Sequence, residues 1–339
     1  MAKTKRSRRH HLKRILTIIL CVILAFGALL GGVYWLVTKD STEAPISTEN
    51  ATNPLITPLG QTMLSGHRAG GGIAPENTMM ALKNCTESDV YTLDIFEFDI
   101  HLTADGIPVL LHDSTLDRTS DAAEVFGEAE VDVGTKNLAE LKTLNMGARF
   151  KNAEGALPFA DLRGDDVPED LRIVTLEEAL TYLESCGEYH YIIEVKNGGD
   201  NGLKATDILY ETLTSHNCLS RTVVGTFHNE VTAYMDETYP DMPRSAGVKE
   251  CVRFYLHAML GLKAKEGTFR FVALQIPTTD YVINLGTSRV INYAHENNIA
   301  VQYWTINSEE EALTLINNGA DCIMTDYPDM VYGAVKSCK

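Results

Sequence analysis

Beyond residue 60 the chain alternates short apolar runs, rich in β-branched residues, with longer runs whose apolar residues recur at helical spacing. The short runs predict buried strands, and the longer runs predict amphipathic helices. Eight strands are expected, at residues 62–65, 95–101, 190–195, 222–225, 245–248, 272–276, 300–305 and 322–325. Seven helices are expected between them, at residues 78–85, 176–185, 204–216, 230–238, 251–262, 288–297 and 309–317.

Strands interleaved with helices in this way pair in parallel through helical crossovers. The eight strands and the length of residues 61–339 suit one α/β domain with the TIM (β/α)8 barrel fold, for which about 250 residues is typical. A doubly wound open sheet is the alternative. No G-x-G-x-x-G motif follows the first strand, however, since Gly70-Gly71-Gly72 lacks that spacing.

The N-terminus has a different pattern, because residues 15–37 contain no charged residue. A run of about 20 apolar residues can span a bilayer. Residues 1–14 carry seven Lys and Arg and no acid, which favours a basic cytoplasmic tail before a transmembrane anchor. A cleaved signal peptide is the rival, but its apolar stretch is usually about 7–15 residues. Here the run is longer and ends on Tyr34-Trp35, which is typical of a membrane interface.

Residues 38–60 are rich in Ser, Thr, Asn and Pro and predict a flexible linker between the anchor and the domain. We therefore expect a single-pass protein of the cell membrane whose large C-terminal domain is extracytoplasmic. The chain beyond residue 37 holds 22 basic and 46 acidic residues, a net charge of −24. Such a surface repels nucleic acid and anionic headgroups, so no nucleic-acid partner is expected and a phosphate site must be a local exception.

The seven cysteines leave two interpretations open. Cys21 lies in the apolar run and the other six lie beyond it. Six cysteines in an oxidising compartment permit disulfides with 15 pairings, and none has the close spacing of a zinc site. Buried free thiols are the alternative.

Candidate chemistry follows the ends of the predicted strands, where a barrel places its catalytic groups. The stretch 108–113 reads as a hairpin arm that brings His112 back beside Glu97. Polar or aromatic residues end five strands: His67 and Arg68, Glu97 and Asp99, Glu194 and Lys196, Trp304, and Thr325 with Asp326.

Residues two apart on a strand share a face, so Glu97 and Asp99 point the same way, as do Glu194 and Lys196. Three carboxylates in one barrel mouth would repel unless a cation neutralised them. Carboxylate oxygens match a divalent metal, Mg²⁺ or Ca²⁺. With two histidines nearby, this combination indicates metal-assisted phosphoester chemistry.

Six motifs in order carry a family resemblance: HR followed by APENT from residue 67, E-x-D from 97, T-x-DG-x-P-V-x-x-HD-x-x-L-x-RT from 103, IEVK from 193, W-T-x-N from 304 and TD-x-P from 325. The chain resembles the glycerophosphodiester phosphodiesterase family from His67 to Pro328. The resemblance implies a TIM barrel that uses a divalent metal to cleave glycerophosphodiesters into glycerol 3-phosphate and an alcohol.

By position, the resemblance also implies a role for each motif residue. His67 and His112 resemble the family's acid/base histidines, which suits imidazole because it titrates near neutral pH. Trp304 is not assigned in this way: it follows the apolar run of the seventh predicted strand, so either it packs against the glycerol or headgroup or it is a core residue of the barrel mouth. Glu97, Asp99 and Glu194 resemble the metal ligands, and Arg68 and Lys196 resemble the phosphate-contacting cations.

Several alternatives stay open at this level. Either histidine can be the base, and the nucleophile can be water or the substrate's own glycerol hydroxyl. The substrate can be a small diester or a glycerol-phosphate polymer of the envelope. The alternative functions are a phospholipase of the C or D type acting on lysolipids and a membrane-tethered binding module without turnover.

Three further expectations concern residues around the site. Glu76 and Asn77 are expected to orient Arg68 or cap the following helix. His101 is expected to be structural. The acidic segment 120–172 is expected to be a surface excursion or a cover over the barrel mouth.

Overall fold

The computed structural model describes residues 26–28, 30–35, 43–265, 267–280 and 283–337. Residues 26–28 and 30–35 are helical. The predicted basic tail, 1–14, lies outside the described residues, as does most of the predicted anchor, 15–37. Within the described part of the chain, no helix is both long and apolar enough to cross a bilayer.

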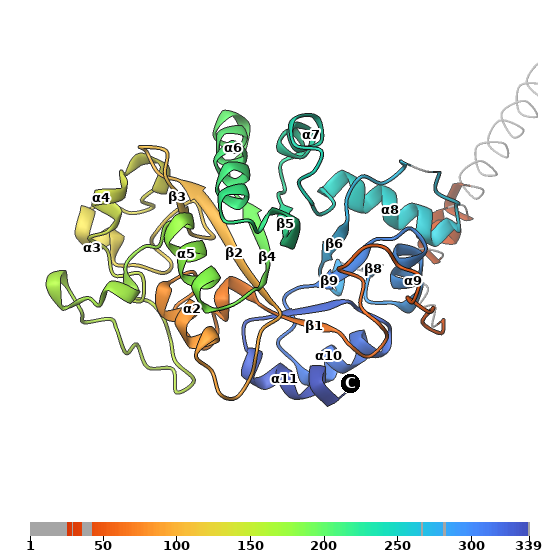
Figure 1. Ribbon diagram of the computed structural model, residues 1–339, viewed down its shortest axis with the longest axis horizontal. Coiled ribbons are helices and arrows are strands. Elements are labelled where there is room, and N and C mark those ends of the chain that lie inside the picture. Colours follow the sequence, from red (N-terminus) through yellow and green to blue (C-terminus); the bar gives the residue numbers. More distant parts are fainter. Residues whose placement is uncertain (1–25, 29, 36–42, 266, 281–282, 338–339) are drawn as a thin grey trace, which may run out of the picture.

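The domain is a barrel of parallel strands surrounded by helices, as predicted (Figure 1). Seven strands follow the order β5-β4-β2-β1-β10-β9-β6. Between β5 and β6, Arg244 pairs with Val224 and Ser245 pairs with Ala273, both in parallel. The strands are β1 (Met63–Gly66), β2 (Ile95–Leu102), β4 (His190–Val195), β5 (Thr222–Gly225), β6 (Ala273–Ile276), β9 (Ala300–Tyr303) and β10 (Cys322–Thr325).

The strand predicted at 245–248 is thus reduced to isolated bridges, and the following helix starts early, at Val248. The reason is local. Gly247 N–H donates to Glu250 Oε2 at 2.9 Å, which caps the first turn of the helix. The barrel is therefore nearly closed, with its fifth position filled by the two bridging residues Arg244 and Ser245.

All seven predicted helices are present, with ends shifted by up to five residues, whereas α11 and the two short helices of segment 120–172 were not predicted. Thr78, Thr175, Thr287 and Ser308 each accept a backbone N–H at the start of a helix. The helices are α2 (Met79–Thr86), α5 (Leu176–Cys186), α6 (Gly199–Ser215), α7 (Asn229–Thr238), α8 (Val248–Leu260), α9 (Ser288–Glu296), α10 (Glu309–Asn317) and α11 (Pro328–Ser337).

The predicted hairpin arm is confirmed. Strand β3 (Pro108–Leu110) runs antiparallel to β2 after a turn at Gly106, whose φ is +78°. Leu111 N–H donates to the carbonyl of Asp99 at 3.0 Å, so His112 follows directly beside β2. A second, separate pair joins β7 (Thr279–Asp280) to β8 (Ile283–Asn284).

Segment 120–172 is packed rather than a loose surface excursion. It contains α3 (Ala122–Phe126) and α4 (Leu138–Leu141), and it shares a second apolar core with β3. Leu116, Leu141 and Leu144 are fully buried there. Short 3-10 turns complete the described chain, at His67–Ala69, Val133–Thr135, Gly164–Asp166, Glu169–Leu171 and Leu219–Arg221.

The described part of the predicted linker, residues 43–60, is fixed to the barrel instead of being flexible. Asn53 Nδ2 donates to the carbonyls of Val272 and Asn298 at 2.7 and 3.0 Å. Leu55 and Ile56 are buried against the first residues of four strands: Ile95, Ala273, Ala300 and Cys322. Composition misled the prediction, because the polar side chains of this segment bond to backbone groups at the bottom of the barrel.

The cysteine question is settled for five residues. Cys85, Cys186, Cys218, Cys251 and Cys322 are free thiols. Cys21 and Cys338 lie outside the described residues.

The bottom closure generates a stability prediction. Leu55→Ala removes apolar contacts from a buried site and should lower the free energy of unfolding by about 2 kcal/mol. Leu59→Ala, in the same segment but half exposed, should change it by no more than about 0.5 kcal/mol. Urea unfolding followed by circular dichroism measures both. Equal effects of the two substitutions would mean that the segment does not seal the barrel.

Candidate active site

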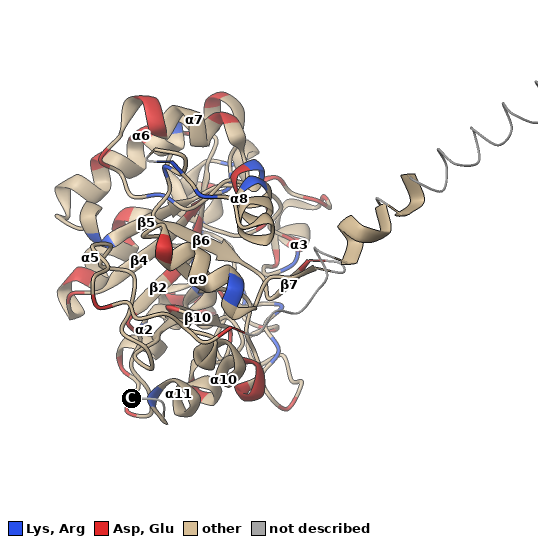
Figure 2. Cartoon of the chain, turned by 90° about the vertical axis from the view of Figure 1, so that its right-hand side faces the viewer, with Lys and Arg blue, Asp and Glu red and all other residues tan. Residues whose placement is uncertain are grey.

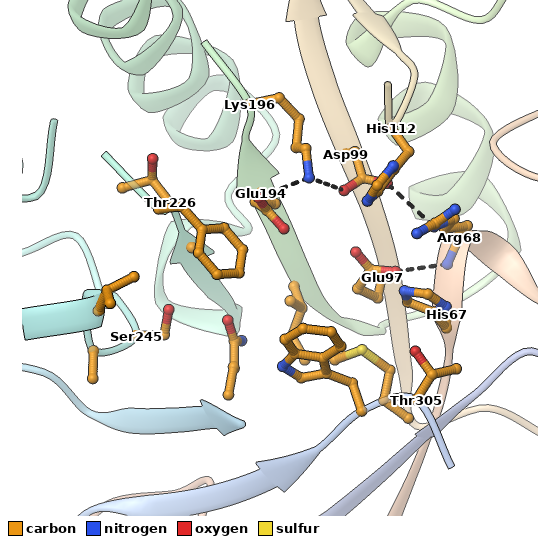
Figure 3. A pocket seen from close by; sticks show the side chains of 18 of the residues that line it. His67, Arg68, Glu97, Asp99, His112, Glu194, Lys196, Thr226, Ser245 and Thr305 are labelled. Atoms are coloured by element: carbon orange, nitrogen blue, oxygen red, sulfur yellow. Dashed lines mark hydrogen bonds and ion pairs between the residues drawn. The ribbon is translucent and has the colours of Figure 1, made fainter. Parts of the chain in front are cut away.

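The eight predicted site residues line one pocket at the carboxyl ends of the strands (Figure 3). Its opposite wall is formed by groups that no motif had marked. These are Gly225, Thr226, Phe227, Ser245 and Gln275. The predicted residues in the pocket are His67, Arg68, Glu97, Asp99, His112, Glu194, Lys196 and Trp304.

The chain leaves β1 through a tight turn in which the backbone N–H of Arg68 faces Glu97 and its side chain faces Glu76. Arg68 and Ala69 have φ of +52° and +60°, a conformation that costs energy for residues with a side chain. In return, the Arg68 N–H donates to Glu97 Oε2 at 2.6 Å. The guanidinium lies beside Glu76, with Nη1 3.2 Å from Oε1. The predicted role of Glu76 in orienting Arg68 is confirmed.

Each histidine is held by a carboxylate. His67 Nδ1 lies 2.6 Å from Asp326 Oδ1, and His112 Nδ1 lies 2.6 Å from Asp113 Oδ1. Asn307 Nδ2 donates to the other oxygen of Asp326 at 2.8 Å. With Nδ1 engaged, Nε2 is the ring nitrogen left for proton exchange. The sequence contained both aspartates, in the TD-x-P and HD motifs, but gave them no role.

The pKa values of the two histidines are shifted in opposite directions. Burial lowers the pKa of His67, but the carboxylates of Glu97 and Asp326 outweigh it, so the net pKa is raised. Burial also lowers the pKa of His112, and there Asp99 and Asp113 do not overcome it. His67 is therefore the more readily protonated of the two histidines and His112 the more readily deprotonated.

The three carboxylates come from adjacent strands in register, with Asp99 of β2 opposite Glu194 of β4. Lys196 Nζ lies between them, 3.0 Å from Glu194 Oε1 and 3.7 Å from Asp99 Oδ1 (Figure 3). Asn77 Nδ2 donates to Asp99 Oδ2 at 3.1 Å. Asn77 thus holds a carboxylate, while the cap of α2 is Thr78.

Burial and mutual repulsion make it unfavourable for all carboxylates of this cluster to be ionised together. Burial, followed by repulsion from Asp99, raises the pKa of Glu97 to about 8. Burial and Asp99 also raise the pKa of Glu194, although Lys196 opposes the shift. Crowded carboxylate oxygens with raised pKa values fit a divalent cation. Within the described residues no set of three or more His, Cys, Asp and Glu is already gathered as a metal cage.

A network of ion pairs between side chains links the two loops that carry the histidines. Arg118 donates through both terminal nitrogens to Glu76, at 2.8 and 2.7 Å, and through Nε to Asp113 at 2.5 Å. Because Asp113 holds His112 and Glu76 holds Arg68, one arginine couples both sides of the site. In the sequence, Arg118 stood out only as part of the motif that begins at residue 103.

Aromatic rings form the far wall of the pocket. The rings of Trp304 and Phe227 meet edge to face, with centroids 6.5 Å apart. Lys196 Nζ lies 5.9 Å from the centroid of Phe227. Trp304 therefore lines the pocket as expected, while Phe227, which follows β5, was missed. His101 is buried beside the pocket with Nε2 3.2 Å from the carbonyl of His112, which agrees with a structural role.

Comparison with known proteins identifies the family to which the chain belongs. Residues 67–330 match the model of the glycerophosphoryl diester phosphodiesterase family. The chain belongs to this family. It is 31% identical to glycerophosphodiester phosphodiesterase 1 of Bos taurus over 66% of its own length, and it spans 60% of the length of that relative.

Solved structures of glycerophosphoryl diester phosphodiesterases share the fold. The chain aligns with the phosphodiesterase domain of a Mycobacterium tuberculosis protein with a TM-score of 0.64 and 16% identity, over 82% of this chain and 100% of that one. A phosphodiesterase of Oleispira antarctica, solved with the product sn-glycerol-3-phosphate, aligns with a TM-score of 0.60 and 22% identity, over 81% and 97%. Family membership makes the chain a phosphoric diester hydrolase.

The ion pairs of Glu76 with Arg68 and Arg118 lead to a prediction about how the side chains of the site are positioned. Glu76→Ala releases Arg68 and Arg118 together. A misplacement of a catalytic group by about 1 Å can cost about 100-fold in rate. We expect kcat/KM for a glycerophosphodiester to fall by about that factor. Glu128→Ala breaks an ion pair with Lys136, and these two residues line neither the catalytic pocket nor the cavity beside Glu76 and Arg118, so kcat/KM should stay unchanged. Steady-state kinetics compare the two. A similar, small effect of both variants would contradict the positioning role.

Proposed function

We propose that this phosphodiesterase is anchored in the cell membrane by residues 15–37 and hydrolyses glycerophosphodiesters outside the cytoplasm. The products are glycerol 3-phosphate and an alcohol. The observation that carries the proposal is the pocket itself, where two carboxylate-held histidines, three carboxylates and two cations face a common space. The product-bound Oleispira structure supports the same substrate class. The apolar, uncharged sequence of residues 15–37 supports the anchor.

Binding and charge balance fall to Arg68 and Lys196. A phosphodiester gains negative charge on its oxygens as the bond to phosphorus changes, and fixed cations stabilise that charge. Lys196 can turn from Glu194 toward the phosphate, because its side chain already lines the pocket. Glu97, Asp99 and Glu194 would hold Mg²⁺ or Ca²⁺, which when bound supplies Lewis-acid stabilisation of the same charge.

Proton transfer falls to the histidines. The opposite pKa directions favour His112 as the acceptor from the attacking hydroxyl and His67 as the donor to the leaving alkoxide. Asp113 and Asp326 fix the ring of each, so that Nε2 exchanges the proton. Attack by water and attack by the substrate's glycerol hydroxyl need the same acceptor.

The substrates that fit the proposed placement are deacylated phospholipid headgroups, and we rank these small diesters ahead of glycerol-phosphate polymers of the envelope. The presence of all eight predicted residues in one pocket supports turnover over a role in binding alone.

The first test is release of glycerol 3-phosphate from glycerophosphocholine by the full chain in detergent. We expect release to stop after chelation and to return with Mg²⁺ or Ca²⁺, because the carboxylate cluster is short of positive charge. His67→Ala and His112→Ala should each lower kcat by 10²–10⁴-fold, roughly the range of general acid–base catalysis.

His216→Ala is the matched control, because His216 also lies beside a carboxylate, Glu177, but outside the pocket. It should retain full activity. A folded protein that releases nothing with either metal would reject small diesters as substrates. Undiminished activity in the chelated protein would reject the metal.

The assignment of the two histidines predicts a bell-shaped pH profile of kcat/KM. Its acidic limb should lie below the ordinary histidine pKa of about 6.5, from His112, and its basic limb above it, from His67. Asp326→Asn removes a carboxylate that raises the pKa of His67, so the basic limb should move to lower pH while the acidic limb stays. Movement of the acidic limb instead would reverse the roles.

A further inference from the structure

Helix α8 carries an apolar stripe on its outer face. Val248, Val252, Leu256 and Leu260 recur every four residues, and their exposed fractions lie between 45% and 58%. A surface helix normally turns polar residues outward and buries one apolar face. The buried face of α8 is supplied by other residues: Phe254, Tyr255, Ala258 and Met259. The exposed stripe is therefore additional to the face that packs on the barrel.

The stripe begins at the mouth of the catalytic pocket. Val248 and Cys251, from the first turn of α8, both line that pocket. Phe227 lines it from the next loop and is 54% exposed. The apolar surface is thus continuous from the aromatic wall of the pocket outward along α8. A partner that covers the stripe would lie against the opening through which the substrate enters.

The charge around the stripe differs from that of the domain as a whole. Two acids, Glu250 and Glu266, occur between residues 248 and 270. Glu250 is held inward by Arg244, with contacts of 2.8 and 3.0 Å. Five basic residues lie in the same stretch: Lys249, Arg253, Lys263, Lys265 and Arg270. A domain that is strongly acidic elsewhere therefore has a local basic border, and Figure 2 shows Lys and Arg positions at α8. Basic residues beside an apolar helical face are typical of helices that lie on anionic lipid.

The N-terminal chain leaves the domain on the same side. Glu43 N–H donates to Ser288 Oγ at 2.8 Å, at the start of α9. Arg289, the next residue, donates through Nη2 to the carbonyl of Met259 at 3.0 Å, near the end of α8. Residues 38–42 separate Glu43 from the end of the apolar run, which limits the span to about 20 Å even when fully extended. With residues 15–37 in a bilayer, α8 lies within reach of its surface.

We propose that the outer face of α8, continued by Phe227, docks on an anionic phospholipid bilayer and turns the pocket toward lipid-borne phosphodiesters. The apolar stripe would insert among the headgroups, and the basic border would face lipid phosphates. The substrate part of this inference rests on the proposed diesterase function, while the docking part rests on the proposed anchor and on the surface of α8.

Fluorescence quenching in vesicles tests the docking directly. The full chain is reconstituted in vesicles of phosphatidylcholine and phosphatidylglycerol whose acyl chains carry bromine, which quenches nearby tryptophan. Leu256→Trp should add a quenched signal to that of Trp35 and Trp304. Val125→Trp is the control, because Val125 is similarly exposed on α3, on the opposite side of the molecule from α8 (Figure 1).

We expect the signal added by Leu256→Trp to fall by about twofold at the depth that interfacial helices reach. The signal added by Val125→Trp should stay unquenched. Equal, absent quenching of the two added signals would overturn the proposal.

A second pair of measurements separates docking from catalysis. Val252→Glu combined with Leu256→Glu places charges on exposed positions that do not line the pocket. Hydrolysis of glycerophosphocholine should be unchanged, while hydrolysis of lysophosphatidylcholine in anionic vesicles should fall by about tenfold, since surface attraction depends on such local charges. Loss of activity on both substrates would contradict a docking role.

An unquenched Leu256→Trp variant that sediments as a dimer would assign the stripe to a second copy of the chain and overturn the proposal that it docks on a bilayer.

If the wild-type chain cleaves neither substrate, the diesterase function fails, yet the quenching result still decides the docking.

Discussion

The site is organised by the need to balance three carboxylates in a buried pocket. Glu97 and Asp99 are almost completely buried, and Glu194 stands beside Asp99 in the sheet register. The backbone of Arg68 and the amine of Lys196 are placed where they oppose this charge. Burial, and then repulsion from Asp99, raises the pKa of Glu97 to about 8, so ionisation of all three carboxylates together is unfavourable without a further cation. A site with residual negative charge attracts a divalent cation, and a bound cation can in turn attract a phosphodiester that the acidic surface would repel.

The same charge explains why the two histidines differ although both are held by aspartates. His67 faces the deeply buried Glu97, and that interaction adds to Asp326 in outweighing burial. At His112 the cations Lys196 and Arg68 add to the effect of burial. Equivalent hydrogen bonds thus give opposite proton affinities, because the surrounding charges are asymmetric. Arg118 binds both Asp113 and Glu76, and so it holds the two loops that carry these charges in a fixed relative position.

Part of the site could be predicted from strand periodicity, and the rest came from the motifs that carry the family resemblance. Side chains two apart on a strand must share a face, which placed Glu97 with Asp99 and Glu194 with Lys196. Residues that act through another side chain left a weaker signal: Asp326 and Asn77 matter only through the groups they hold. Residues 43–60 were mispredicted because composition reports how polar a segment is, but not whether its polar groups find partners in the fold. The exposed stripe of α8 was also invisible, since a sequence pattern cannot tell which of two apolar faces is covered.

The path of the N-terminal segment connects these separate parts. It meets α9 at Ser288, continues past Asn292 and Asn298, and ends beneath the strands with Leu55 and Ile56. Its hydrogen bonds fix the point at which the chain departs toward residues 15–37, so an anchor there would restrain orientation as well as distance. If residues 15–37 are an anchor, this attachment would place α8 and the start of α9 on the side of the domain nearest to it. The segment that packs against the bottom of the barrel would then also bring the surface of α8 toward a membrane.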